Sequence, residues 1–247
     1  MIAVDLPGHG ESDPRPGVSV EEYAAVVAEF LIALECGPVV VIGHSLGGAI
    51  ALALAARHPA LVRGLVLIAS CVKLPLVDSV GERLVAYLPG PLRRLVFFSM
   101  AKKVLFAPQA PAHAIDIAMR DLRACRPETI MSDVRAARAM DLTEPAAALD
   151  VPTLVLTGAR DRLTTPVLAA GLCALIRGSR LRLADGAGHM LPMEAPEWVN
   201  REIATFVASL AEPLPSSATI ATRRLSLARR VLDWLTRVAR PGSPMPR

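Results

Sequence analysis

The chain has 247 residues, 53% of them apolar but only 4% aromatic, so it can bury an aliphatic core and offers few rings on which nucleic-acid bases could stack. Its net charge of +4 comes from the C-terminal tail: residues 212–247 carry seven Arg against Glu212 and Asp233, and the body sums to about −1. No secretory leader, no membrane-spanning run of ~18 apolar residues and no paired cysteines are evident. We therefore expect a cytoplasmic protein without a nucleic-acid partner.

Short runs of β-branched residues alternate with longer segments of helical periodicity. This alternation predicts an α/β fold with a mostly parallel sheet flanked by helices. We expect strands at Ile2–Leu6, Val39–Ile42, Leu65–Ala69, Thr153–Thr157 and Leu181–Ala184. We expect helices at Val20–Leu34, Gly47–Arg57, Pro166–Ile176 and Pro196–Leu210. In such sheets ligands gather at the carboxyl ends of the strands, so the functional residues are sought there.

The alternation stops in the middle of the chain. Helical stretches broken by prolines predict an inserted helical cap at residues 72–148, which divides the core into residues 1–71 and 149–210. The insertion has apolar faces in Leu92–Leu105 and Ile115–Leu122. An ordinary helical subdomain with its own core explains the same pattern.

The tail, residues 211–247, is predicted to be a linker followed by a basic amphipathic helix at 219–240. Leu227, Val231, Leu235 and Val238 form its apolar stripe. Such a helix either packs back onto the domain, lies on an anionic membrane surface or fits a partner's groove. Peripheral contact with a membrane through residues 219–240 is therefore one of the alternatives.

The sequence Gly43-His44-Ser45-Leu46-Gly47 matches the G-x-S-x-G pattern and stands between an apolar strand and an Ala-rich helix. A sharp strand-to-helix turn lifts a serine hydroxyl clear of the sheet, which predicts Ser45 as a nucleophile. The N–H of Leu46 is the candidate donor to an oxyanion, because it lies at the helix N-terminus. The alternative is a glycine turn with a solvent-facing serine.

A nucleophilic serine needs a base, and His189 is the best candidate among the five histidines. It follows the last expected strand in the glycine loop Asp185–Met190, which can direct the imidazole toward the strand ends. His44 is expected to point away from Ser45. His9 lies between two glycines after the first expected strand, but no acid partner is suggested for it.

Asp161 follows another strand and is the predicted acid that orients the imidazole. The order Ser, Asp, His along the chain is that of α/β-hydrolases. Asp185 is the second choice, although it more plausibly caps the loop before His189. Asp78 is the third.

Together the segments Asp5–Ser12, Gly43–Gly48, Gly158–Pro166 and Gly186–His189 resemble the α/β-hydrolase superfamily in order and spacing, over residues 1 to about 210. The resemblance implies a catalytic triad of Ser45, Asp161 and His189, a helical cap, and catalysis without a metal or an organic cofactor. Relatives in the superfamily include carboxylesterases, lactonases, C–C bond hydrolases and cofactor-free haloperoxidases.

One departure from the superfamily concerns the N-terminus. Relatives have three further strands before the first strand expected here, and a His-Gly loop that supplies the second oxyanion N–H. Either part of the protein precedes Met1, which we favour, or the homologue is shortened. If the sheet lacks those strands and Leu46 donates alone, we expect poor solubility or weak activity.

We expect a serine hydrolase that cleaves a carboxylic ester, thioester or lactone through an acyl-enzyme on Ser45. The aliphatic cap favours an apolar small-molecule substrate. Two alternatives stay open: a C–C bond hydrolase or cofactor-free haloperoxidase that uses the same triad, and a truncated, non-catalytic homologue that acts as an interaction protein.

Overall fold

The computed structural model describes residues 1–15, 18–75 and 89–210. Asp78 and the predicted linker and amphipathic helix of residues 211–247 lie outside the described residues. Within the described part of the chain, no helix combines the length and the apolar character that crossing a membrane requires.

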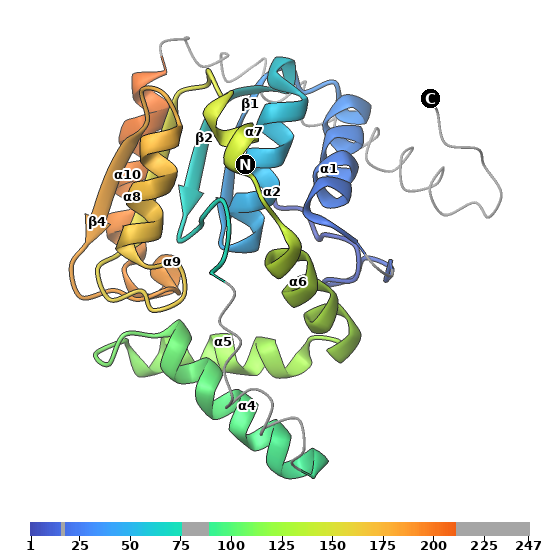
Figure 1. Cartoon of the computed structure of the whole chain (residues 1–247), viewed down its shortest axis with the longest axis vertical. Coiled ribbons are helices and arrows are strands. Elements are labelled where there is room, and N and C mark those ends of the chain that lie inside the picture. Colours follow the sequence, from blue (N-terminus) through green and yellow to red (C-terminus); the bar gives the residue numbers. More distant parts are fainter. Residues whose placement is uncertain (16–17, 76–88, 211–247) are drawn as a thin grey trace, which may run out of the picture.

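In this described part, four parallel strands form a single sheet in the order in which they occur along the chain. They are β1 (Val39–His44), β2 (Val62–Ile68), β3 (Thr153–Gly158) and β4 (Arg180–Ala184). Their alternation with helices confirms the predicted α/β class, and four of the five expected strands are present. Because all four strands run in the same direction, their carboxyl ends meet at one edge of the sheet (Figure 1).

The prediction of a fifth strand at Ile2–Leu6 is wrong. These residues have no regular secondary structure, and Ile2 and Val4 are 47% and 39% exposed. A strand needs a neighbour that accepts and donates its backbone hydrogen bonds, and none of the described strands pairs with this segment. Its β-branched composition therefore does not produce a strand here.

Helices cover both faces of the sheet (Figure 1). Leu65, Leu67 and Val155 point to the face that carries α1 (Val20–Leu34), α2 (Leu46–Arg57) and α8 (Pro166–Leu175). Intervening residues such as Val66 and Leu156 point to the opposite face, which carries α9 (Leu191–Glu194) and α10 (Pro196–Ser209). The short helix η1 (Pro59–Leu61) leads into β2.

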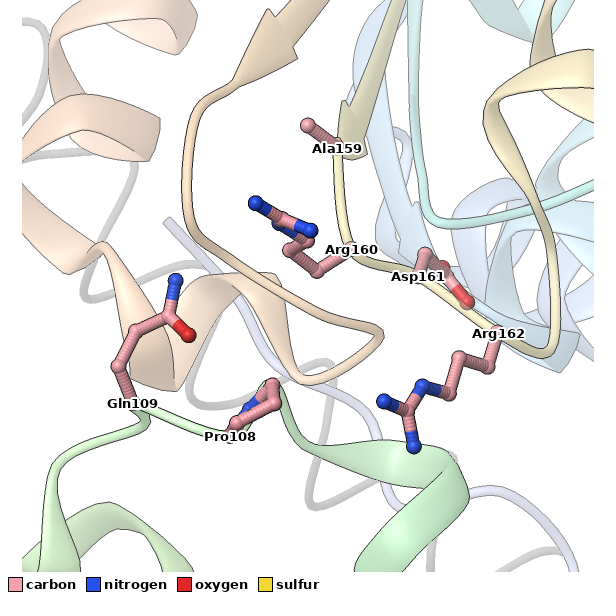
Figure 2. Close-up of a pocket in the computed structure, with 6 residues that line it drawn as sticks. All are labelled: Pro108, Gln109, Ala159, Arg160, Asp161 and Arg162. Atoms are coloured by element: carbon pink, nitrogen blue, oxygen red, sulfur yellow. The ribbon is translucent and has the colours of Figure 1, made fainter.

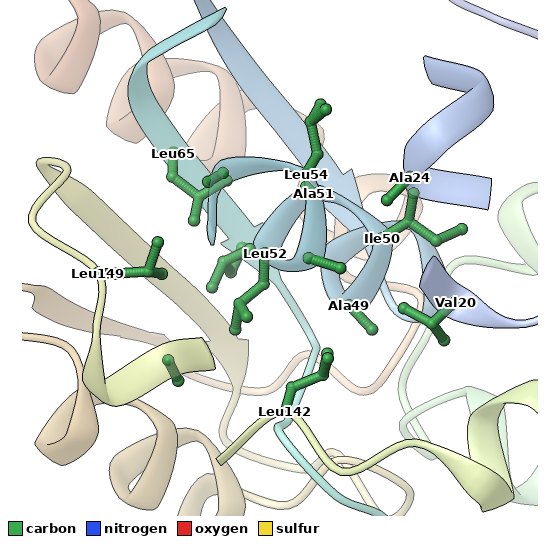
Figure 3. Packing of buried hydrophobic residues seen from close by; sticks show 14 of the residues in the cluster. Val20, Ala24, Ala49, Ile50, Ala51, Leu52, Leu54, Leu65, Leu142 and Leu149 are labelled. Atoms are coloured by element: carbon green, nitrogen blue, oxygen red, sulfur yellow. The ribbon is translucent and has the colours of Figure 1, made fainter. Parts of the chain in front are cut away.

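The helix α2 lies at the centre of the larger core. Eight of its residues are buried, and its small alanines let Leu52 and Leu54 pack closely against the sheet and the neighbouring helices (Figure 3). The preceding helix α1 starts at Val20 because Ser19 and Glu22 form a capping box. This packing fixes the N-terminal end of α2, where Ser45 lies.

Between β2 and β3, the residues that the structure describes form four more helices, namely α4 (Gly90–Leu105), α5 (Ala112–Ala124), α6 (Pro127–Ala139) and α7 (Thr143–Ala147). The short α7 packs against α2 and α8 of the core. We call α4 to α6, residues 90–139, the helical insertion. Figure 1 shows α4 and α5 lying away from the sheet, with α6 between them and the core helices α1 and α2.

Candidate active site

Ser45 occupies a strained turn between β1 and α2. Its backbone has φ 53° and ψ −119°, a conformation that residues with a side chain rarely adopt. The Ser45 N–H donates to the Ile68 carbonyl at 2.8 Å, which ties the turn to β2. A Cβ on Gly43 would overlap the Gly47 carbonyl, so a glycine is needed where the chain reverses. The strain holds the hydroxyl in place at the end of the strand.

His189 comes from the loop after β4 and is only 2% exposed. Its Nε2 lies 2.9 Å from the Ser45 Oγ, and its Nδ1 lies 3.0 Å from Oδ2 of Asp161. The structure thus brings together the three side chains that the sequence singles out, although Ser45 and His189 are 144 residues apart.

The Asp161 carboxylate is buried and accepts several hydrogen bonds. Oδ1 accepts from the backbone N–H groups of Leu163 at 2.8 Å and Thr164 at 2.9 Å. Oδ2 accepts from the Thr164 hydroxyl at 2.8 Å and from His189. Burial alone would raise the pKa of Asp161, but the hydrogen bonds from His189, Thr164 and Leu163 outweigh it and the pKa is lowered. The ionised carboxylate keeps the proton of a neutral His189 on Nδ1, so Nε2 can accept from Ser45.

Asp185, the second-choice acid, is exposed in the turn after β4. The carboxylate at hydrogen-bond distance from the His189 ring is that of Asp161. A Cβ on Gly158 would overlap the carbonyls of Ala187 and Gly188, so the glycine that ends β3 allows the two loops to approach each other.

Two residues that sequence reasoning did not assign to the site support His189. Nε2–H of His44 donates to the His189 carbonyl at 2.8 Å. Burial and the nearby His189 lower the pKa of His44 to about 4, so at neutral pH it stays an uncharged donor. The Thr164 hydroxyl lies 3.2 Å from Nδ1 of His189. The Asp161-x-x-Thr164 spacing could have indicated Thr164, whereas nothing local indicates the contact of His44.

A cavity of about 350 Å³ opens in front of Ser45. One side consists of the carboxyl ends of the strands, and the other is α6 with the residues that follow it. The exposed lining is mainly apolar, and its polar side chains are those of Ser45, Ser70, Asp133, Arg138 and Thr164. The other residues that line it are Leu46, Cys71, Leu74, Val134, Ala137, Met140 and Leu163. Leu46 is the first residue of α2, and the first N–H groups of a helix have no intrahelical acceptor.

A second cavity of about 370 Å³ lies between residues 159–162, which follow β3, and Pro108 and Gln109, which follow α4 (Figure 2). Arg160 extends between Ala159 and Gln109, while Arg162 points toward the end of α4 and donates to the Lys103 carbonyl at 3.3 Å. Neither Ser45 nor His189 lines this cavity. The reacting atoms therefore face the first cavity. Among the residues that the structure describes, no three His, Cys, Asp or Glu side chains gather as metal ligands would.

Residues 1–202 match the alpha/beta hydrolase family. The chain belongs to this family. A pimeloyl-(acyl-carrier protein) methyl ester esterase of Neisseria meningitidis is 33% identical over 198 residues, covering 76% of this chain and 75% of the relative. The 2-(acetamidomethylene)succinate hydrolase of Mesorhizobium japonicum is 27% identical, covering 83% and 77%.

Solved structures agree with this assignment. A thermophilic esterase from Thermogutta terrifontis superposes with a TM-score of 0.71 at 26% identity, covering 84% of this α/β hydrolase and 79% of the esterase. A hydrolase from Pseudomonas aeruginosa gives a TM-score of 0.72 at 26% identity, covering 82% and 77%. The chain is therefore an α/β-hydrolase enzyme whose relatives are esterases and other hydrolases.

Proposed function

We propose that this α/β hydrolase cleaves a carboxylic ester, thioester or lactone through an acyl-enzyme on Ser45. The observation that carries the proposal is the chain of contacts from the Ser45 Oγ to Nε2 of His189 at 2.9 Å and from Nδ1 to Asp161 at 3.0 Å. Ser45, at one end of this series of contacts, lines a cavity. The series is the arrangement that activates a hydroxyl for attack on a carbonyl.

In the acylation step, Ser45 Oγ attacks the carbonyl carbon while its proton passes to Nε2 of His189. Asp161 stabilises the resulting imidazolium through the hydrogen bond to Nδ1. The N–H of Leu46, at the positive end of α2, donates to the oxyanion of the tetrahedral intermediate. His189 then gives its proton to the leaving oxygen or sulfur as the carbonyl re-forms, which leaves Ser45 acylated.

Water completes the reaction. His189 removes a proton from the water as its oxygen attacks the acyl carbon, and a second tetrahedral intermediate forms. The proton returns to Ser45 Oγ when the acyl–serine bond breaks, so one water is consumed and one acid is released. Nδ1–H must stay directed at Asp161 throughout, and the contacts of Thr164 and His44 support this orientation.

The aliphatic lining of the cavity supports an apolar acyl group as the part of the substrate that it binds. The Neisseria relative is named as an esterase for pimeloyl-(acyl-carrier protein) methyl ester, and we infer that an ester of a small alcohol with a larger acyl group suits this site too. Each CH₂ that becomes buried should raise kcat/KM by about three- to fourfold until the cavity is full. A series of p-nitrophenyl esters from acetate to octanoate measures this gain.

The nucleophile is tested with a fluorophosphonate probe and ester turnover. Ser45→Ala should abolish labelling and lower kcat by roughly 10⁶-fold, as loss of the serine does in a comparable triad. Ser99→Ala, which changes an exposed serine on α4, is the matched control and should label normally. Labelling of the Ser45→Ala variant would refute the assignment of the nucleophile. Labelling of the wild type without turnover of any ester would refute ester hydrolysis and favour the C–C bond hydrolase alternative.

A further inference from the structure

A polar cluster outside the proposed triad joins the helical insertion to the core. Asp133 projects from α6, and its Oδ2 lies 2.9 Å from Nε2 of His9, in the loop after the first residues of the chain. Its Oδ1 accepts a hydrogen bond of 2.8 Å from the Tyr23 hydroxyl of α1. Sequence reasoning found no acid partner for His9, and the structure supplies one 124 residues away.

The contacts of His9 are those of an imidazolium. Its Nε2 faces the Asp133 carboxylate, and its Nδ1 lies 3.3 Å from the Pro7 carbonyl. A carbonyl oxygen only accepts and the ionised carboxylate also accepts, so both ring nitrogens are placed to donate. The hydrogen bond to Asp133 and its charge raise the pKa of His9, although burial acts in the opposite direction.

Other groups around His9 agree with this assignment. Tyr23, whose ring meets the His9 ring edge-on, has a pKa raised by burial and by Asp133, so it remains a neutral donor. The Arg126 guanidinium at the start of α6 donates to the carbonyls of Gly8 and Ser12. Asp5, Glu11 and Asp13 are the acidic residues that flank His9 within its own loop, and the Asp5 carboxylate accepts from the Glu11 N–H at 3.2 Å.

The same helix forms the wall of the cavity opposite Ser45. Asp133 lines the cavity together with Val134, Ala137 and Arg138 of α6. A further contact between α6 and this loop, from the Thr129 hydroxyl to the Gly8 carbonyl at 3.1 Å, lies one turn earlier on the helix. Figure 1 shows α6 between the core and the outer helices, so a shift of α6 relative to the loop would move the wall and change the space in front of Ser45.

We propose that Asp133 is a positioning residue which, held by His9 and Tyr23, fastens α6 over Ser45 and fixes the acyl side of the cavity. We call the three residues the α6 latch. The latch sets the affinity for longer acyl groups and loosens as the pH rises. The kinetic consequence rests on the proposed function, whereas the motion of α6 does not.

The direction of the pH effect follows from His9. A histidine whose pKa is raised in the folded state contributes its full stabilisation below the unfolded value of about 6.5, and loses it as the pH rises through the raised value. Below the raised pKa, protonated His9 pairs with Asp133. Above the raised pKa the attraction between the two charges disappears, and α6 opens more often.

Steady-state kinetics on the ester series test the latch. Asp133→Asn should raise KM for octanoate by about two- to fivefold, the effect of losing a partly exposed charged contact. Asp116→Asn, the same change at an exposed position of α5, is the matched control. In the wild type, KM for octanoate should rise with pH through the raised pKa of His9, while in Asp133→Asn and His9→Gln it should stay flat. An unchanged KM in Asp133→Asn, or an unaltered pH profile in both variants, would overturn the proposal.

Hydrogen exchange tests the latch without any substrate. After correction for the pH dependence of chemical exchange, amides of α6 should exchange faster in Asp133→Asn than in the wild type, while amides of α2 should not change. Tyr23→Phe removes only the hydroxyl that donates to Asp133 and keeps the core packing of the ring. The amides of α6 should exchange faster in this variant, too, than in the wild type. Equal exchange of α6 in all these proteins would refute the latch even if ester turnover is normal. Faster exchange of α6 in a protein that turns over no ester would support the latch and refute the proposed function.

Discussion

The Thr164→Val substitution tests the network around Asp161. Valine has nearly the shape of threonine, so the change removes a hydroxyl and leaves the packing in place. That hydroxyl donates to Asp161 Oδ2 at 2.8 Å and lies 3.2 Å from Nδ1 of His189. The backbone donors from Leu163 and Thr164 remain, so the carboxylate stays ionised at neutral pH.

The magnitude follows from the loss of one hydrogen bond to a buried charge. Such a bond contributes about 1.5–3 kcal/mol, and the three remaining donors to Asp161 favour the lower part of that range. A loss of about 1.5–2 kcal/mol would raise the pKa of Asp161 toward its ordinary value and lower Tm by about 3–8 °C. Since His189 loses part of its support, we expect kcat/KM to fall by about tenfold.

The free energy of unfolding, measured with urea at several pH values, separates this effect from a packing defect. Asp161 has a lowered folded pKa, so its stabilisation is present above the unfolded value of about 3.9 and is lost as the pH falls through the folded value. The deficit of Thr164→Val should therefore be full at pH 7 and shrink below about pH 4. Thr165→Val is the control, because the Thr165 side chain makes no capping hydrogen bond. A deficit that does not depend on pH, or an equal deficit in the control, would refute the argument.

Three further predictions concern the core and the turn at Ser45. His44→Phe leaves the His189 carbonyl without its hydrogen-bond donor, so kcat should fall while KM stays unchanged. A kcat equal to that of the wild type would contradict the role of His44 in supporting His189. Gly43→Ala should prevent folding, because the added Cβ would overlap the Gly47 carbonyl. Gly47→Ala has open space at its Cβ, so it should raise the free energy of unfolding by about 0.5–1 kcal/mol. Circular dichroism and urea unfolding of the two variants test both expectations. Leu52→Ala should lower the free energy of unfolding, measured with urea, by about 2–5 kcal/mol. A decrease of less than about 1 kcal/mol would show that neighbouring side chains fill the cavity left by Leu52, contrary to this expectation.

Local patterns predicted most of the fold correctly. The limits of α1 follow from the serine cap at Ser19, the glutamate three residues later and the apolar period between Val20 and Leu34. The strands β1, β2 and β3 could be found because each is a short run rich in β-branched residues that a turn terminates. The segment Ile2–Leu6 has the same local character, but strand formation also requires a partner, and composition does not report one.

The candidate site was predictable to the extent that topology brings strand ends together. Ser45, Asp161 and His189 each follow a strand of the same parallel sheet, so their proximity could be inferred before any distance was known. His44 and the His9–Asp133 pair could not be found in this way. Their contacts span 145 and 124 residues and depend on the path of one loop and the orientation of α6, which no local pattern determines.

The site combines two kinds of support that differ in strength. Ser45 lies between a strand and a helix whose buried leucines each contribute a few kcal/mol, and the Asp161 and His189 side chains are fully enclosed. The helix α6 buries the small side chains of Thr129, Ser132 and Ala136. Its contact between His9 and Asp133, whose side chains are 32% and 21% exposed, is a partly exposed ion pair of the kind that contributes about 0–1 kcal/mol. Local opening of α6 should therefore require much less free energy than unfolding of the sheet. It follows that substitutions in α6 act mainly on KM and on the choice of acyl group, whereas substitutions beside Asp161 and His189 act mainly on kcat.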